Sequence, residues 1–236
     1  MRKIALITGT GRGIGKALAE LLLRENFKVF GYSRTNQIEN ENFTFIKTDL
    51  SKLEDVQKIK FPKIKSPDSV MLVNNAATIG EIVPLDKKSE PGIIDEYNLN
   101  IIAPTIFCKK FIQSYKMVKK LIINIGSGAA KKAISSWSTY CATKSGLDML
   151  TEVIAEEKHQ NLTLFSVHPG IVDTNMQKEI RDSDPDSFHL LDKFIAYYND
   201  GELENIQDIA KKIYYITQNI NKFPDNIISL RDVNIK

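Results

Sequence analysis

Cysteine is scarce in this sequence: Cys108 and Cys141 are the only two in 236 residues, and they lie far apart. Neither belongs to a Cys-x-x-Cys pair, so the sequence predicts neither a disulfide framework nor a structural zinc site. Long apolar runs are also missing. The run from Ile4 to Ile7 is too short for a signal peptide, and none approaches the length of a membrane span. We therefore expect a cytoplasmic protein without a membrane-embedded part.

An excess of either charge is missing as well, because 32 basic and 29 acidic residues leave a formal net charge of +3. Such a balance argues against nucleic acid or an anionic membrane as the partner. Hydrophobic residues make up 42% and charged residues 26% of the chain, as in an ordinary soluble globule. The length fits a single domain that covers residues 1–236.

Short apolar runs alternate with segments of helical periodicity along the chain. The runs predict strands at 3–7, 28–33, 43–47, 69–73, 121–125 and 162–167, with a last edge strand at 226–230. Helices are predicted from about residue 14, from about 51, over 90–115, from about 136 to about 159 and over 205–219. This alternation predicts an α/β fold, with one doubly wound, Rossmann-like parallel sheet of about seven strands and helices on both faces.

A glycine-rich loop, Thr8-Gly9-Thr10-Gly11-Arg12-Gly13-Ile14-Gly15, follows the first strand at once and opens the first helix. Glycines permit a tight turn and a close approach of the backbone to a pyrophosphate, and the helix N-terminus offers free N–H groups. The strand–loop–helix context favours a dinucleotide site over a plain glycine-rich turn.

Ser33 and Arg34 stand at the end of the second strand, where a dinucleotide fold commonly places an acid that binds the ribose. An arginine there can hold a 2′-phosphate that a carboxylate would repel, and Arg12 offers a second positive charge. The pattern favours NADP(H) over NAD, unless Arg34 is only a surface residue. After the third strand, Asp49 either accepts from the adenine amino group or caps the short helix that follows.

The fourth strand ends in Asn74-Asn75-Ala76-Ala77. Small residues and side-chain amides suit a place where the backbone meets a cofactor, and they also suit an ordinary strand-ending turn. Asn100 lies inside the helical segment 90–115, four residues before Pro104, which is expected to kink the helix. Asn100 is either a satisfied core amide or a residue that holds water near the kink.

Tyr140 and Lys144 are four residues apart in the predicted helix 136–159 and therefore share one helical face. A nearby ammonium lowers the pKa of a phenol, which would make Tyr140 usable as a proton donor or acceptor. Ser127, thirteen residues before Tyr140, follows the buried strand 121–125 and its hydroxyl can bind the same oxygen. The Tyr-x-x-x-Lys pair alone is weak evidence, because such pairs are common on exposed helices.

Residues 175–204 are polar, with interspersed aromatic residues at Phe188, Phe194, Tyr197 and Tyr198. They predict short helices joined by loops. Such a segment is either a lid over a site or an ordinary surface excursion.

These motifs, in this order and spacing, resemble the short-chain dehydrogenase/reductase family over nearly the whole chain. The resemblance rests on Thr8-Gly9-x-x-x-Gly13-x-Gly15, Asp49, Asn74-Asn75-Ala76, Asn100, Ser127, Tyr140-x-x-x-Lys144 and Pro169-Gly170. Ala77 is a mild departure from the family's Asn-Asn-Ala-Gly motif. Each motif is weak alone, whereas the combination is highly specific.

The resemblance implies the roles of the catalytic residues. Tyr140 would be the general acid toward a carbonyl, and Ser127 would position and polarise that carbonyl. Lys144 would hold the nicotinamide ribose and lower the pKa of Tyr140. Asn100 would support a water chain that carries protons from solvent. No metal is expected on this interpretation.

The resemblance also implies the cofactor contacts and the assembly. The contacts carry over to Gly9, Thr10, Arg12, Gly13, Ile14, Gly15, Ser33, Arg34, Asp49, Leu50, Asn75, Ala76, Pro169, Ile171, Val172 and Thr174. Ile171, Val172 and Thr174 match the family's segment that contacts the nicotinamide carboxamide. The family further implies a homodimer or homotetramer built from the long helices near Asn100 and Tyr140.

Two stretches narrow the branch of the family. Residues 169–177 and the C-terminal Ser229-Leu230-Arg231-Asp232 look like the corresponding parts of sepiapterin reductases and bacterial benzil reductases. Sepiapterin reductases carry an acid in this C-terminal stretch, and Ser229 aligns with it, although Asp232 is close. A serine in place of that acid favours a reductase of 1,2-dicarbonyl compounds over a sepiapterin reductase.

Trp137 and Met176 would wall the pocket for such a substrate, unless Trp137 is a partly buried surface residue. Two other functions stay open. One is a different activity on the same site, such as a 3-oxoacyl reductase or a sugar or steroid alcohol dehydrogenase. The other is an NADP-binding protein that has the fold without the chemistry.

Overall fold

Seven parallel strands form the centre of the molecule in the computed structural model, which describes residues 2–235. In space they follow the order β3-β2-β1-β4-β5-β6-β7. The direction of the strand order reverses between β1 and β4, which is where doubly wound sheets bind ligands, beyond the carboxyl ends of the strands. The strands are β1 (Lys3–Thr8), β2 (Phe27–Ser33), β3 (Phe43–Lys47), β4 (Ser69–Asn74), β5 (Lys119–Ile125), β6 (Leu162–His168) and β7 (Ile227–Ser229).

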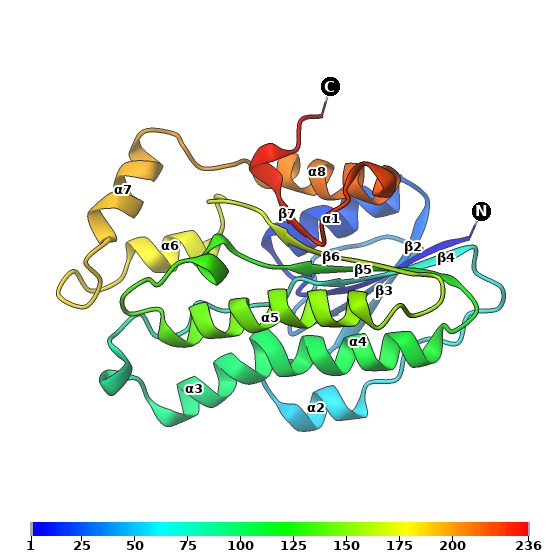
Figure 1. Ribbon diagram of the computed structural model, residues 1–236, viewed down its shortest axis with the longest axis horizontal. Coiled ribbons are helices and arrows are strands. Elements are labelled where there is room, and N and C mark those ends of the chain that lie inside the picture. The colour runs from blue at the N-terminus through cyan, green and yellow to red at the C-terminus, as the bar shows by residue number, and fades with distance from the viewer. Residues whose placement is uncertain (1, 236) are drawn as a thin grey trace.

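Helices cover both faces of this sheet (Figure 1). One face carries α1 (Gly13–Arg24) and α8 (Ile206–Gln218), and the other carries α2 (Leu53–Lys58), α3 (Glu90–Tyr97), α4 (Ala103–Ser114) and α5 (Ser138–Glu156). Single turns of 3₁₀-helix lie at Leu85–Lys87, Gly128–Lys131, Ile220–Lys222 and Leu230–Asp232. The predicted fold class is confirmed.

Strand β1 shows why the central strands appear as continuous apolar runs in the sequence. Ala5 and Ile7 pack into the core on the α1 and α8 side, whereas Ile4 and Leu6 pack into the core on the α4 side. All four side chains are fully buried. A strand that is covered on both faces has no polar face, so its sequence does not alternate.

The predicted helix 90–115 is interrupted. Helix α3 ends at Tyr97, a π-helical turn covers Asn98–Ile102, and α4 begins at Ala103. Pro104 stands in the first turn of α4 and has no N–H group to donate to the turn before it. The backbone stays helical from Tyr97 to Ala103, and the wide turn directly before Pro104 contains Asn100. Turns of this kind often mark functional sites. The expected kink at Pro104 stays a prediction.

Residues 173–204 leave the sheet as a separate excursion at one end of the molecule (Figure 1). It contains α6 (Asn175–Arg181) and α7 (Leu191–Asn199), as the predicted short helices. Its two ends meet, because Glu204 N donates to Ile171 O at 2.8 Å and Asp173 N donates to Glu204 O at 3.1 Å. Within residues 2–235, no helix combines the length and the apolar character needed to cross a membrane.

Candidate active site

Tyr140, Lys144 and Ser127 come together at the carboxyl end of β5. Lys144 is 3% exposed, and its Nζ donates to the carbonyl oxygen of Ile125, the last residue of β5, at 2.7 Å. Tyr140 is only 6% exposed, so its hydroxyl does not face bulk solvent. Ser127 stands two residues beyond the strand, and its side chain acts to lower the pKa of Tyr140. The sequence placed these three side chains in one pocket, and the structure brings them together.

The electrostatics differ from the sequence-based expectation. Burial raises the pKa of Tyr140, and the nearby Ser127 side chain only partly opposes that effect. Burial lowers the pKa of Lys144 to about 8, with Asp148 acting in the opposite direction. The expected lowering of the Tyr140 pKa by Lys144 is therefore not observed in the protein without cofactor. The ammonium points at the Ile125 carbonyl and lies 5.8 Å from the centre of the Tyr140 ring.

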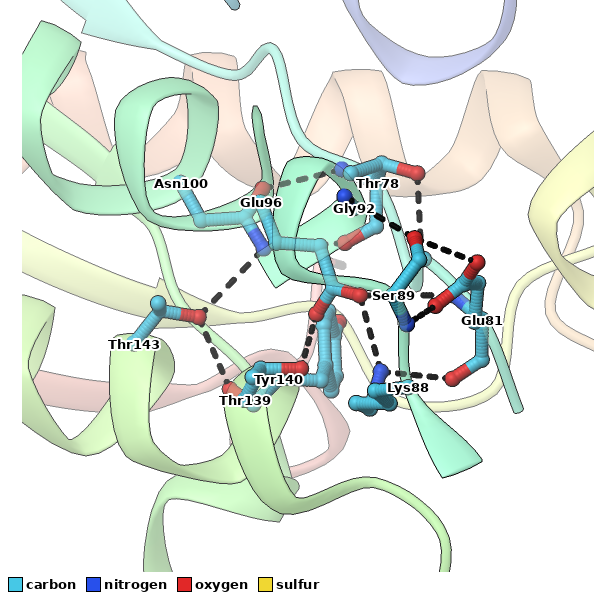
Figure 2. Close-up of polar contacts among 11 residues, drawn as sticks. Thr78, Glu81, Lys88, Ser89, Gly92, Glu96, Asn100, Thr139, Tyr140 and Thr143 are labelled. Atoms are coloured by element: carbon cyan, nitrogen blue, oxygen red, sulfur yellow. Dashed lines mark hydrogen bonds and ion pairs between the residues drawn. The ribbon is translucent and has the colours of Figure 1, made fainter. Parts of the chain in front are cut away.

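Asn100 connects the loop after β4 with α5 (Figure 2). Its Oδ1 accepts from Thr78 N at 2.9 Å, and its Nδ2 donates to Thr78 O at 2.9 Å and to Thr143 Oγ1 at 3.3 Å. Thr143 Oγ1 in turn donates to the backbone oxygen of Tyr140 at 3.0 Å. Asn100 is thus a satisfied core amide, the first of the two alternatives, and it fixes the backbone on which Tyr140 stands.

A buried ion pair one helical turn before Asn100 was missed by the sequence reasoning. Glu96 Oε1 lies 2.8 Å from Lys88 Nζ, and the two side chains are 2% and 0% exposed. Glu96 Oε2 accepts a hydrogen bond from Thr139, the neighbour of Tyr140 in α5 (Figure 2). Lys88 Nζ also donates to Glu81 O at 2.6 Å. Lysine and glutamate are normally surface residues, so the sequence carried no signal for this pair.

The glycine loop forms a cradle that leaves no room for side chains. Gly9 has φ of +76°, and a Cβ there would stand 2.8 Å from Nδ2 of Asn75. A Cβ on Gly15 would collide with the same amide and with Gly9 O. The Asn75 amide holds the loop by donating to Thr8 O at 2.9 Å and to Gly9 O at 3.3 Å. The cradle is thus tied to the end of β4.

Helix α1 begins at this cradle. Within the described residues, its N-cap residue Arg12 makes no side-chain capping bond to the first turn. The N–H groups of that turn are therefore available to an anion, and the helix dipole favours negative charge there. This donor set fits the pyrophosphate of a nicotinamide dinucleotide. Thr174 also lies beside the loop, since its Cγ2 would be 3.8 Å from a Cβ on Gly13.

A cavity of about 450 Å³ lies where β2 and β3 end and is lined by Arg34, Lys47, Thr48, Asp49 and Asp55. Arg34 is exposed there, and a ligand can reach its charge. Asp49 Oδ1 accepts from Ser51 N at 3.1 Å and from Ser51 Oγ at 2.9 Å, so it caps the turn that leads into α2. Asp49 does not cap α2 itself, because the helix begins at Leu53 with Lys52 as its N-cap residue and without a side-chain capping bond. The contact of Asp49 with the adenine amino group stays a prediction.

The remaining predicted cofactor residues make contacts within the protein. Ser33 is buried, and its hydroxyl lies 3.1 Å from Thr10 Oγ1 and donates to Thr35 O at 2.7 Å. Arg12 Nη2 lies 3.4 Å from Glu179 of α6. This ion pair points Arg12 toward the excursion 173–204. Leu50 and Ala76 pack in the core on the α4 side, and Pro169, Ile171 and Val172 follow β6.

An aromatic cluster covers Tyr140 from the side of the excursion. The Trp137 ring stacks on Phe188 with centroids 5.4 Å apart, and it meets the Tyr140 ring edge-on at 5.7 Å. Met176 Sδ lies 3.9 Å from the Tyr140 hydroxyl oxygen. Trp137 is 5% exposed, so it is not the partly buried surface residue that the sequence left open. Both residues predicted for the substrate pocket contact Tyr140.

Comparison with known proteins agrees with this geometry. Residues 3–185 match the sequence model of the family described as short chain dehydrogenase. The chain belongs to this family. Members of the short-chain dehydrogenase family use a nicotinamide cofactor, and the cradle fits one. The protein is accordingly an oxidoreductase that acts on CH–OH or C=O groups.

Several relatives of this short-chain dehydrogenase are carbonyl reductases. Benzil reductase ((S)-benzoin forming) of Bacillus cereus is 34% identical over 229 residues, which are 89% of this chain and 92% of the relative. Benzil reductase of Bacillus subtilis is 32% identical, with 88% and 90% of the two chains covered. Sepiapterin reductase of Bos taurus is 26% identical, covering 92% of this chain and 90% of the relative.

The solved structures support the fold. A short-chain dehydrogenase/reductase from Saccharomyces cerevisiae matches with a TM-score of 0.83 at 22% identity, covering 98% of this chain and 96% of the other. A second one from Burkholderia vietnamiensis matches with a TM-score of 0.67 at 27% identity, covering 78% of this chain and 93% of the other.

The predicted likeness to the benzil and sepiapterin reductase branch is confirmed by the relatives at the sequence level.

Proposed function

We propose that this short-chain dehydrogenase reduces a ketone of the 1,2-dicarbonyl class with NADPH. The observation that carries the proposal is the buried Tyr140 phenol, which shares its helical face with the buried Lys144 at the end of β5 and whose pKa responds to Ser127. Burial raises the pKa of Tyr140, which keeps the phenol protonated at neutral pH and suits it to donate a proton. The dicarbonyl preference is supported by the resemblance to the two Bacillus benzil reductases.

The chain's own residues supply proton transfer and positioning in this reaction. Tyr140 gives its hydroxyl proton to the carbonyl oxygen, and the Ser127 hydroxyl holds that oxygen in place. NADPH, when bound in the cradle, supplies the hydride that adds to the carbonyl carbon. Lys144 would hold the nicotinamide ribose, while Trp137 and Met176 confine the substrate against Tyr140. The excursion 173–204 would act as the lid.

A panel of substrates tests this assignment. With NADPH in excess, benzil and other 1,2-diketones are expected to give a higher kcat/KM than sepiapterin, a 3-oxoacyl thioester, a sugar or a steroid ketone. The aromatic side chains of Trp137 and Phe188 make the surroundings of Tyr140 apolar, which favours apolar substrates. Preferred turnover of the acyl thioester would favour the 3-oxoacyl reductase alternative. Failure to reduce any carbonyl would reject the proposed activity.

The choice of NADPH rests on Arg34, which with Lys47 is one of two exposed cations that line the 450 Å³ cavity. Arg34→Asp replaces a phosphate-binding charge by a repelling one. We expect the Kd for NADPH to rise about 100-fold, since a charged hydrogen bond contributes roughly 3 kcal/mol at most, while the Kd for NADH changes little. Isothermal titration with each cofactor measures both values.

Arg24→Asp makes the same charge change at the far end of α1 and serves as the control. It is expected to leave both dissociation constants near those of the parent protein. Equal weakening of NADPH and NADH binding by Arg34→Asp would refute the proposed recognition of the 2′-phosphate.

A further inference from the structure

A buried carboxylate lies directly behind Lys144 in α5. Asp148 follows Lys144 by four residues, on the same helical face, and is 8% exposed. The Lys144 ammonium is itself buried. Within residues 2–235 it donates one hydrogen bond, to the neutral carbonyl oxygen of Ile125. A buried ammonium is costly without an opposite charge nearby. Asp148 is the carboxylate that offers one.

Two residues of β6 fix the position of this carboxylate. Ser166 Oγ donates to Asp148 Oδ1 at 2.6 Å, and His168 Nε2 lies 2.9 Å from Oδ2 and 3.1 Å from Oδ1. Ser166 and His168 are two residues apart on a strand, so both point from the sheet toward α5. Ser166 is fully buried and His168 is 8% exposed. The carboxylate is thus held between the helix and the sheet with little access to water.

The same cluster touches the strand end that carries Ser127. A Cβ on Gly126 would stand 2.7 Å from Cδ2 of His168 and would also press on Ser166 Oγ. Gly126 N donates to Val167 O at 2.9 Å, which joins β5 and β6 at this point. The cluster of Asp148, Ser166 and His168 therefore contacts both the Lys144 helix and the backbone next to Ser127.

We propose that Asp148 is a positioning residue whose carboxylate, held by Ser166 and His168, keeps Lys144 cationic and so sets the upper pH limit of turnover. In residues 2–235, the titratable groups that face this pair are Tyr140 on α5 and His168 on β6. The effect of Asp148 on turnover rests on the role of Lys144 in the proposed function. The effect of Asp148 on the charge of Lys144 is independent of that function.

The sign of the effect follows from the charges. Burial lowers the pKa of Lys144 to about 8, and the Asp148 carboxylate raises it, which opposes burial. Removal of the carboxylate therefore lowers the pKa of Lys144 further. The ammonium then loses its proton at a lower pH, and the alkaline limb of the kcat profile moves to lower pH with it.

Asp148→Asn tests the proposal because asparagine keeps the shape and removes the charge. The titration of Lys144 is followed by NMR of the Cε resonance in cofactor-free protein labelled with ¹³C-lysine. The resonance is assigned by its absence in Lys144→Met. We expect its midpoint near pH 8 in the parent protein. In the variant it is expected to fall by roughly one pH unit or more, as for loss of a close opposite charge.

Asp148→Ser is a second charge-free variant with a smaller side chain. If the Asn variant does not fold, the Lys144 titration midpoint is measured in Asp148→Ser. Glu152→Gln, on the exposed side of the same helix, is the matched control and should leave the midpoint unchanged. A Lys144 midpoint in the charge-free variants equal to that of the parent would overturn the proposal. A shifted midpoint with an unshifted kcat profile would instead refute the role of Lys144 in the proposed function.

Discussion

Tyr140→Phe is expected to lower kcat about a thousandfold, within the range that a positioned general acid contributes. The change removes one oxygen atom and leaves the ring, which packs edge-on against Trp137 at 5.7 Å. The fold and the binding of the cofactor should therefore persist, and the loss should appear in kcat and not in the Kd for NADPH. Steady-state kinetics with a diketone and a separate titration with NADPH measure the two quantities.

Tyr214→Phe provides the matched control for this experiment. Its hydroxyl donates to Glu25 at 2.9 Å, and the residue lies on α8, on the opposite face of the sheet from α5. The same atom is removed, yet kcat should stay near that of the parent. If Tyr140→Phe were as active as the parent, the proton would have to come from another group, and the assignment of Tyr140 would fail.

The fold was predictable from the sequence because its signals are local or periodic. Residues 4–7 are apolar without alternation, as expected of a strand that is buried on both faces. The glycine loop predicts a close approach of the backbone to a pyrophosphate. In the structure the Asn75 amide also takes the space that side chains at Gly9 and Gly15 would need. Tyr140 and Lys144 share a helical face in any helix, so their joint placement needed no tertiary information.

The parts that escaped prediction depend on tertiary contacts. Whether an ammonium four residues away lowers the pKa of a phenol depends on burial and on the ammonium's other partners. Here burial raises the pKa of Tyr140, and Lys144 is directed to Ile125 O. The burial of Glu96 is likewise decided by packing between distant segments, and no local pattern in the sequence marks it. The wide turn at Asn98–Ile102 has a local signal, since Pro104 follows it closely.

Lys88→Met is expected to lower the free energy of unfolding by about 3–5 kcal/mol, the usual effect of breaking a buried ion pair from one side. The Glu96 carboxylate would remain buried with only hydrogen bonds from Thr139 and from Glu81 N, which lies 3.3 Å from Oε1 (Figure 2). Those donors do not replace a cation at 2.8 Å. Urea unfolding at fixed protein concentration measures the change.

The exposed pair Lys211–Asp208 supplies the contrast, with side chains 60% and 58% exposed. Lys211→Met should change stability by less than about 1 kcal/mol, because water screens that pair. The double variant Lys88→Met/Glu96→Gln should be more stable than Lys88→Met alone, since it leaves no unpaired buried charge. If the two single effects simply added, the pair would act through packing and not through charge. Because Glu96 binds Thr139 beside Tyr140, the double variant also reports whether turnover needs that carboxylate or only the hydrogen bond.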